Sequence, residues 1–153
     1  MEIPKPTDAH RKLQSLVGIW KAEEKMFPPW DPKGVMVVSH VNNRSALDGL
    51  AVIQDYEVAM NDIVNFRGHG IFTWDPISQL YVLHWFDSME TGANVFQGSF
   101  DNKKLTMTNK SQQGYARASW EIISDKSYIY KLETSSDGNQ WQAMVEGSYS
   151  LIG

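Results

Sequence analysis

Histidines are the first residues to consider for proton transfer, because imidazole is the side chain that ordinarily titrates near neutral pH. The chain has four of them: His10, His40, His69 and His84. Alternation along the flanking segments predicts that His40 and His69 face solvent. His84 lies in LYVLHWFD, where apolar residues occupy both parities, so the pattern leaves its direction open. If His84 points inward, it is the best candidate for a general base.

Arg117 is the second candidate for a catalytic or charge-binding residue, because its fixed fork holds a carboxylate through two hydrogen bonds. Simple alternation turns Ala116 and Ala118 inward, which favours an outward Arg117. The inward alternative stays open but needs a buried counter-charge. The candidates for that counter-charge are Glu24, Glu133 and Glu146.

No metal or cofactor site is predicted. No two histidines have the i, i+2 spacing that puts both on one face of a strand, and His84 and Asp87 fall on opposite faces. The chain has no cysteine, which excludes disulfides, thiolate ligands and a cysteine nucleophile. It also has no phosphate loop, dinucleotide fingerprint or Ser-His-Asp arrangement at motif spacing.

Aromatic residues recur in segment after segment, with six Trp, six Tyr and six Phe in 153 residues. Any one of them is explained as core packing. Together they would form a wall for a flat or polyene-like apolar ligand, with one or two polar groups to orient it. The residues predicted to contact such a ligand are Trp20, Tyr56, Phe72, Trp74, Trp85, Trp120, Tyr130, Met144 and Glu146.

The segments that carry these residues read as strands. RGHGIFTWDPISQLYVLHWFDS, residues 67–88, predicts a hairpin that turns at Asp75-Pro76-Ile77-Ser78. From Gly18 onward about ten such segments are separated by turn signals. Their predicted bounds are Ile19–Phe27, Val35–Asn42, Leu50–Met60, Ile63–Trp74, Leu80–Asp87, Asn94–Phe100, Lys104–Asn109, Tyr115–Ile123, Ser127–Thr134 and Gln140–Leu151.

Short strands joined by tight turns pair antiparallel, and a meander of about ten removes its edges by closing into a barrel. A barrel wider than eight strands has more interior than its own side chains readily fill, so a cavity is expected. A short helix over residues 7–17 would plug one end, and residues 18–152 would form the barrel. We therefore predict one all-β domain over residues 1–153.

Composition restricts the function classes. The net charge is −4, and lysine and arginine are scattered singly, which argues against a nucleic-acid partner. The N-terminal residues lack the apolar core of a secretory signal, and no apolar run approaches the length of a membrane span. We expect a cytoplasmic protein. The sequence leaves self-association into a homodimer open.

Gly18-Ile19-Trp20, directly after the predicted helix, resembles the Gly-x-Trp signature of lipocalins and their calycin relatives. The chain as a whole is similar to a bacterial family catalogued as domain of unknown function 1579, whose members are lipocalin-like barrels. The segments that carry the similarity are PTDAHRKLQSLVGIW, TWDPISQLYVLHWFDS, the strand with Gly98 and DGNQWQAMVEGSY. The resemblance implies a calycin-type barrel with an apolar interior.

Related barrels serve as carriers, haem proteins and cyclases, so the resemblance implies no single reaction. The nitrobindin group binds haem through a histidine in the C-terminal part of the barrel, whereas no histidine follows His84 here. Fatty-acid-binding relatives hold a ligand carboxylate with inward arginine and tyrosine. By that resemblance, Arg117 with Tyr130 or Tyr149 would form such a site.

The sequence supports three hypotheses. The first is binding of a small apolar molecule in the barrel. The second is a small cofactor-independent cyclase or isomerase that acts on an apolar polyene or aromatic intermediate, with His84, Arg117 or a carboxylate moving a proton. The third is a barrel filled by its own side chains, whose outer face mediates self-association.

Overall fold

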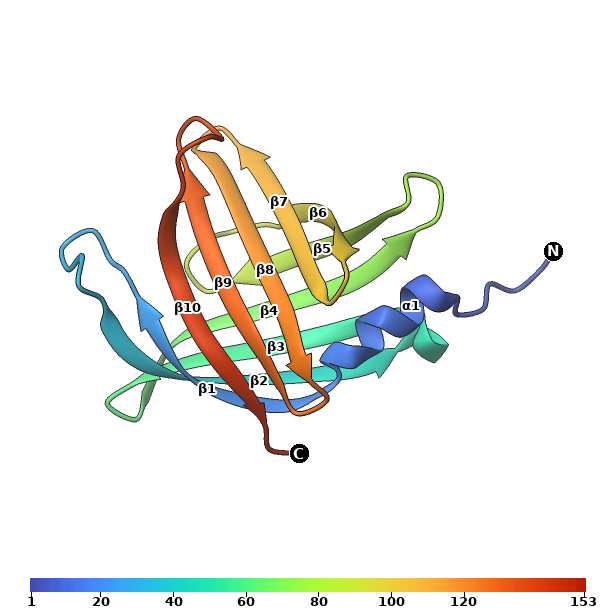
Figure 1. Ribbon diagram of the computed structural model, residues 1–153, viewed down its shortest axis with the longest axis horizontal. Coiled ribbons are helices and arrows are strands. Elements are labelled where there is room, and N and C mark those ends of the chain that lie inside the picture. Colours follow the sequence, from blue (N-terminus) through green and yellow to red (C-terminus); the bar gives the residue numbers. More distant parts are fainter.

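Ten antiparallel strands close into a barrel in the computed structural model, which describes residues 1–153 (Figure 1). The strands are β1 (Gly18–Met26), β2 (Val35–Ala46), β3 (Ala51–Met60), β4 (Ile63–Asp75), β5 (Leu80–Asp87), β6 (Asn94–Asp101), β7 (Lys104–Ser111), β8 (Gly114–Ser124), β9 (Ser127–Ser135) and β10 (Gln142–Leu151). Each strand pairs with its neighbours in the chain, and β1 pairs with β10 to close the barrel. The predicted ten-stranded up-and-down barrel is confirmed.

The N-terminal helix covers one end of the barrel. It consists of α1 (Asp8–Leu13), which follows Thr7, and one 3-10 turn, η1 (Gln14–Leu16). Leu13 and Leu16 are fully buried, and the Tyr81 hydroxyl donates to the carbonyl of Ala9 at 2.7 Å. The predicted helix is therefore present, and its apolar side is sealed against the strands. The structure contains no helix with the length and hydrophobicity needed to span a bilayer.

The predicted end of the second strand at Asn42-Asn43 is wrong. β2 continues to Ala46, and the chain turns at η2 (Leu47–Gly49) instead. Asn43 has the sequence of a turn residue but lies inside the barrel, 1% exposed, where its side-chain amide donates to the Leu16 carbonyl at 2.8 Å. The indole of Trp20 donates to the same carbonyl at 2.9 Å. Two buried donors thus satisfy a carbonyl at the end of the helical segment.

Alternation sets which side chains face inward. In β1, Trp20, Ala22 and Glu24 are buried, while the residues between them are exposed. Next to the helix the interior is filled by packed rings. Trp20 meets Tyr128 edge-on with centroids 4.7 Å apart, and Tyr128 stacks on Tyr149 at 4.8 Å. The side chains therefore fill the plugged end.

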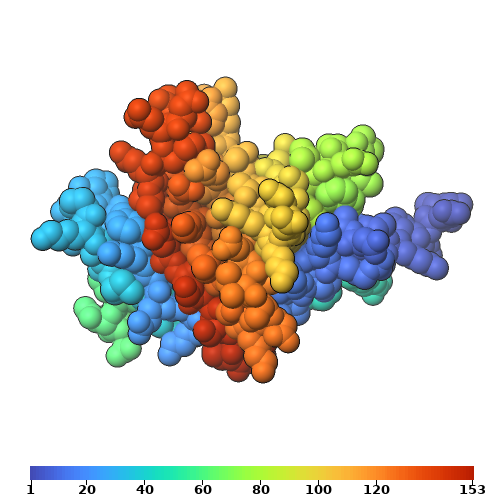
Figure 2. All heavy atoms as spheres, viewed as in Figure 1, coloured from blue at the N-terminus to red at the C-terminus, as the bar shows by residue number.

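The other end of the barrel carries the β1–β2, β3–β4, β5–β6, β7–β8 and β9–β10 connections. Figure 1 shows β7 to β10 crossing over β2 to β5, with α1 at the end away from the β1–β2 loop. In Figure 2 the strands coloured yellow to red cover the near face, and the N-terminal residues project at one side. The two ends of the barrel are thus different: one is plugged and the other carries only loops.

Leu16→Ala tests the plug. Leu16 is 0% exposed, so truncation should lower the free energy of unfolding by about 2–5 kcal/mol. Leu47→Ala is the matched control, because Leu47 is 69% exposed and should change stability by less than about 0.5 kcal/mol. Urea denaturation of both variants gives the comparison. Equal midpoints for the two would show that the helix does not contribute to the core.

Candidate ligand-binding site

The loop-bearing end of the barrel encloses a cavity of about 750 Å³. Twenty-one of its 26 lining residues are hydrophobic. No lysine, arginine or histidine lines it, and Asp87 is the one acidic residue that does. The cavity is thus an apolar space inside the barrel, and its polar side-chain groups are those of Gln54, Asn65 and Asp87, the tyrosine hydroxyls and the tryptophan indole N–H groups.

Five of the nine residues predicted to contact a ligand line this cavity: Tyr56, Trp85, Trp120, Tyr130 and Met144. The other four lie elsewhere. Trp20 lies below the helix, Phe72 packs edge-on against Trp120 at 5.3 Å, and Trp74 packs against Tyr81 at 4.7 Å. Glu146 pairs in register with Lys25 and Lys131 and does not line the cavity.

His84 and Arg117 do not line the cavity either. Tyr81 and Leu83 take the inward positions of β5, which leaves His84 exposed. Arg117 ion-pairs with Glu133 at 3.1 Å, and its guanidinium lies 4.1 Å from the centre of the Trp141 ring. Alternation thus predicted the direction of Arg117 correctly. A role for either residue in proton transfer stays a prediction that this geometry does not support.

The remaining histidines also lie apart from the cavity. His40 is exposed, as predicted, and His69 pairs with Asp55 at 2.7 Å on the outer side of the sheet. His10 accepts a hydrogen bond from the backbone amide of Thr7 at 3.0 Å. No group of three or more His, Cys, Asp or Glu side chains is placed to hold a metal ion.

Glu24 is a fully buried ionisable group, 0% exposed, and does not itself line the cavity. Alternation in β1 places it inward. The hydroxyls of Ser39, on β2, and Tyr56, on β3, both donate to its Oε1 atom. Tyr56 lines the cavity, so Glu24 lies directly behind a residue of the cavity wall. We call Glu24, Ser39, Tyr56 and Tyr149 the Glu24 cluster.

Tyr149, on β10, completes this cluster. Its hydroxyl lowers the pKa of Glu24, yet the oxygen makes no hydrogen bond of normal geometry, and Glu24 Oε2 is also buried without a partner. Gly147 pairs in register with Glu24, and a Cβ at that position would lie 2.7 Å from Glu24 Cγ. The glycine therefore provides the space that the Glu24 side chain occupies.

Burial raises the pKa of Glu24 above its ordinary value, and the hydrogen bonds from Ser39 and Tyr56, together with the nearby Tyr149 hydroxyl, oppose that rise. Burial, with the nearby Glu24 carboxyl, likewise raises the pKa of Tyr56 and Tyr130. No cation lines the surrounding cavity to stabilise a negative charge. The raised pKa values therefore shift the Glu24 carboxyl toward its protonated form and keep the phenols protonated in this apolar space.

The sequence analysis considered Glu24 only as a counter-charge for Arg117. The signal for its inward position was nevertheless present, because Trp20, Ala22 and Glu24 share one parity of a strand whose other parity holds Lys21 and Lys25. Ser39 likewise shares its parity with three valines of β2. The contact between Glu24 and Ser39 could not be predicted from parity alone, because it depends on the pairing register of β1 with β2, in which Ala22 lies opposite Ser39.

The pH dependence of the free energy of unfolding should reveal the raised pKa of the buried Glu24 carboxyl. The folded pKa of Glu24 exceeds the unfolded value, near 4.5, so the folded state binds more protons, and wild-type stability falls as pH rises from 4.5 to the folded pKa. Glu24→Gln removes this loss. As pH rises through that range, the free energy of unfolding of the variant should increase relative to that of the wild type by up to about 1.4 kcal/mol per pH unit. Urea titrations at several pH values measure it, with Glu23→Gln on the exposed face as control. A Glu24→Gln difference that is independent of pH would contradict the assignment.

Similar barrels occur among solved structures. The crystal structure of Rv2717c from M. tuberculosis has a TM-score of 0.70 at 12% identity, over 96% of this chain and 99% of that one. The S-type phycobiliprotein lyase CPES from Guillardia theta has a TM-score of 0.61 at 7% identity, over 97% and 99%. At these identities the likeness shows a common fold. A search of curated proteins finds no match. The sequence profile of the family described as "Protein of unknown function (DUF1579)" matches residues 5–150, so the chain belongs to this family, as its sequence motifs indicated.

Proposed function

We propose that the protein binds a small apolar molecule inside the barrel. The observation that carries the proposal is the cavity of about 750 Å³, whose wall is hydrophobic at 21 of 26 residues. Small-molecule sites commonly have volumes of about 300–1,000 Å³ and a largely apolar lining. Transfer of apolar ligand surface from water into such a space supplies the affinity.

The wall also offers a few groups that would orient a ligand. Gln54 is 5% exposed and lines the cavity from β3, where its amide can donate and accept. Trp120 and Tyr130 present neighbouring rings with centroids 5.3 Å apart. A flat ligand would gain contact area from these rings.

Cytoplasmic location and self-association remain predictions from the sequence alone.

Filling the cavity with a larger side chain should weaken ligand binding. Ala118 is 3% exposed and lines the cavity from β8, so Ala118→Phe occupies space that a ligand needs. Fluorescence titration with Nile red, an uncharged apolar dye, should show saturable binding to the wild type and at least about tenfold weaker binding to Ala118→Phe. Ser148→Phe places the same side chain on the exposed face of β10 and should bind like the wild type. Absence of dye binding to the wild type would contradict the proposal.

A second candidate function is proton-transfer catalysis by a small isomerase or cyclase. The observation that favours it is the hydrogen bond from the Tyr56 hydroxyl, at the cavity wall, to the buried Glu24 carboxyl. As a carboxylate, Glu24 would accept the Tyr56 proton while the Tyr56 oxygen takes a proton from a substrate carbon. The reverse transfer to a different carbon yields an isomer, with every proton accounted for. A raised pKa makes the carboxylate a stronger base. The structural neighbour from Guillardia theta is named a lyase, which supports considering an enzymatic role for this fold.

Hydrogen exchange tests this candidate. Apolar compounds that co-purify with the protein from its own host would be extracted and incubated with it in D₂O. Catalysed proton transfer should add deuterium to the compound, as measured by mass spectrometry. Glu24→Gln and Tyr56→Phe should slow that incorporation by about 10²-fold or more. Incorporation at wild-type rate in both variants would exclude the Glu24 cluster as the proton carrier.

A further inference from the structure

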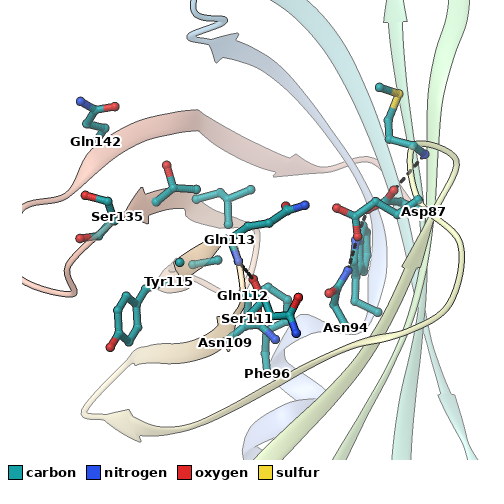
Figure 3. Close-up of a pocket in the computed structure, with 18 of the residues that line it drawn as sticks. Asp87, Asn94, Phe96, Asn109, Ser111, Gln112, Gln113, Tyr115, Ser135 and Gln142 are labelled. Carbon is teal, nitrogen blue, oxygen red and sulfur yellow. Dashed lines mark hydrogen bonds between the residues drawn. The ribbon is translucent and has the colours of Figure 1, made fainter.

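A groove of about 1,500 Å³ adjoins the cavity at the same end of the barrel (Figure 3). The β5–β6 connection, the β7–β8 hairpin and the β9–β10 connection contribute its lining. The groove and the cavity share five lining residues: Trp85, Asp87, Met89, Phe96 and Leu132. The groove and the cavity therefore adjoin at these side chains, and a ligand that passes them would occupy both.

The groove differs chemically from the cavity, because amides and hydroxyls replace hydrophobic side chains. Four glutamines line it: Gln112 and Gln113 in the β7–β8 hairpin, and Gln140 and Gln142 at the β9–β10 connection. The Gln113 side chain points into the space between the strand ends, toward Asp87 (Figure 3). An amide donates and accepts at once, as a hydroxyl group does. The groove thus suits a partner that carries several hydroxyl groups.

Aromatic rings accompany these amides. Trp141 lines the groove, and Trp85 lies where the groove meets the cavity, whereas the Tyr115 ring points away from Gln113 (Figure 3). Rings next to hydrogen-bonding side chains can contact the C–H faces of a polyhydroxyl ring while the amides bond its hydroxyls. This combination distinguishes the groove from a merely polar surface.

The charges argue against an ionised head group. No lysine, arginine or histidine lines the groove or the cavity. Two cations lie near the groove but outside its lining: Arg117, behind Trp141, is paired with Glu133, and the Lys110 ammonium lies 5.5 Å from the centre of the Tyr115 ring. A carboxylate or phosphate would lose water beside Asp87 without gaining a cation, which is unfavourable.

Neutral donors bind the two acidic groups of the lining but leave their negative charge in place, so a cationic head group is the competing ligand class. Asp87 accepts hydrogen bonds from the Trp85 indole and the Met89 amide, both at 2.9 Å. Glu90 accepts from the Asn94 side chain at 2.6 Å. Amides and hydroxyls outnumber these two carboxylates in the lining, which favours an uncharged head group over a cationic one.

We propose that the groove is a head-group subsite and that the ligand is an amphiphile with an uncharged polyhydroxyl head and an apolar tail. The tail enters the cavity, and the head bonds the glutamine amides. This inference rests on the proposed binding function and specifies its ligand class.

Displacement of Nile red by ligands with one tail and different heads tests the proposal. The competitors are octyl β-D-glucoside, octanoate, octyltrimethylammonium and octan-1-ol, each below its micellar concentration. The glucoside should bind at least about tenfold more tightly than each of the others, since two net hydrogen bonds of ordinary strength suffice for this ratio. Equal displacement by all four would overturn the head-group subsite while leaving apolar binding intact. No binding of Nile red would overturn the proposed function itself.

Two variants, with one control, test whether the preference for the glucoside depends on the groove glutamines. The double variant Gln112→Ala with Gln113→Ala should weaken glucoside binding by about tenfold and leave octanol binding unchanged. Gln97→Ala, an exposed glutamine of β6 outside the groove, is the matched control. Gln113→Lys supplies a cation and should shift the preference toward octanoate. Glucoside affinity that is unchanged in the double variant, or octanoate affinity that is unchanged in Gln113→Lys, would overturn the assignment.

Discussion

Closure of the barrel by the pairing of β1 with β10 is the constraint on which the rest of the structure depends. Closure pairs the backbone N–H and C=O groups of both edge strands and gives every strand an inner and an outer face. Ten strands enclose more space than their side chains fill. Helix α1 and the Trp20 ring occupy one end, the cavity occupies the other, and the stacked rings of Tyr128 and Tyr149 lie between them and line the cavity. The plug and the cavity are therefore two consequences of the same strand number.

The same register places Glu24 against Ser39 and Tyr56 on one side and opposite Gly147 on the other. A shift of one residue in β1 would turn Trp20, Ala22 and Glu24 to solvent and Lys25 inward, so the apolar neighbours of Glu24 fix this register. A buried carboxyl costs free energy of folding even with two hydroxyl donors. A group that opposes folding, next to a cavity, is more readily explained by a role in that cavity than by packing.

Much of the fold could be predicted because turn chemistry is local. Asp75-Pro76 marks a turn wherever it occurs, and strand number followed from such signals. The error at Asn43 came from a tertiary contact with Leu16, which no local pattern contains. Parity gave the direction of Arg117 but not of His84, whose neighbours are apolar on both faces. Parity also says nothing about height along the barrel axis. Trp20 and Trp120 are both buried, yet only Trp120 lines the cavity, because Trp20 lies at the plugged end.

The position of the groove bears on both proposed functions. Groove residues come from β5 to β10 and their connections, whereas the Glu24 cluster belongs to β1, β2, β3 and β10. An amphiphile with its head in the groove therefore directs its tail into the cavity whose wall includes Tyr56. A saturated tail offers Tyr56 and Glu24 no carbon that can exchange a proton, and the protein would then act as a carrier. An unsaturated tail places an activated C–H bond within the same space. Binding and catalysis thus differ in the chemistry of the tail rather than in the architecture of the site.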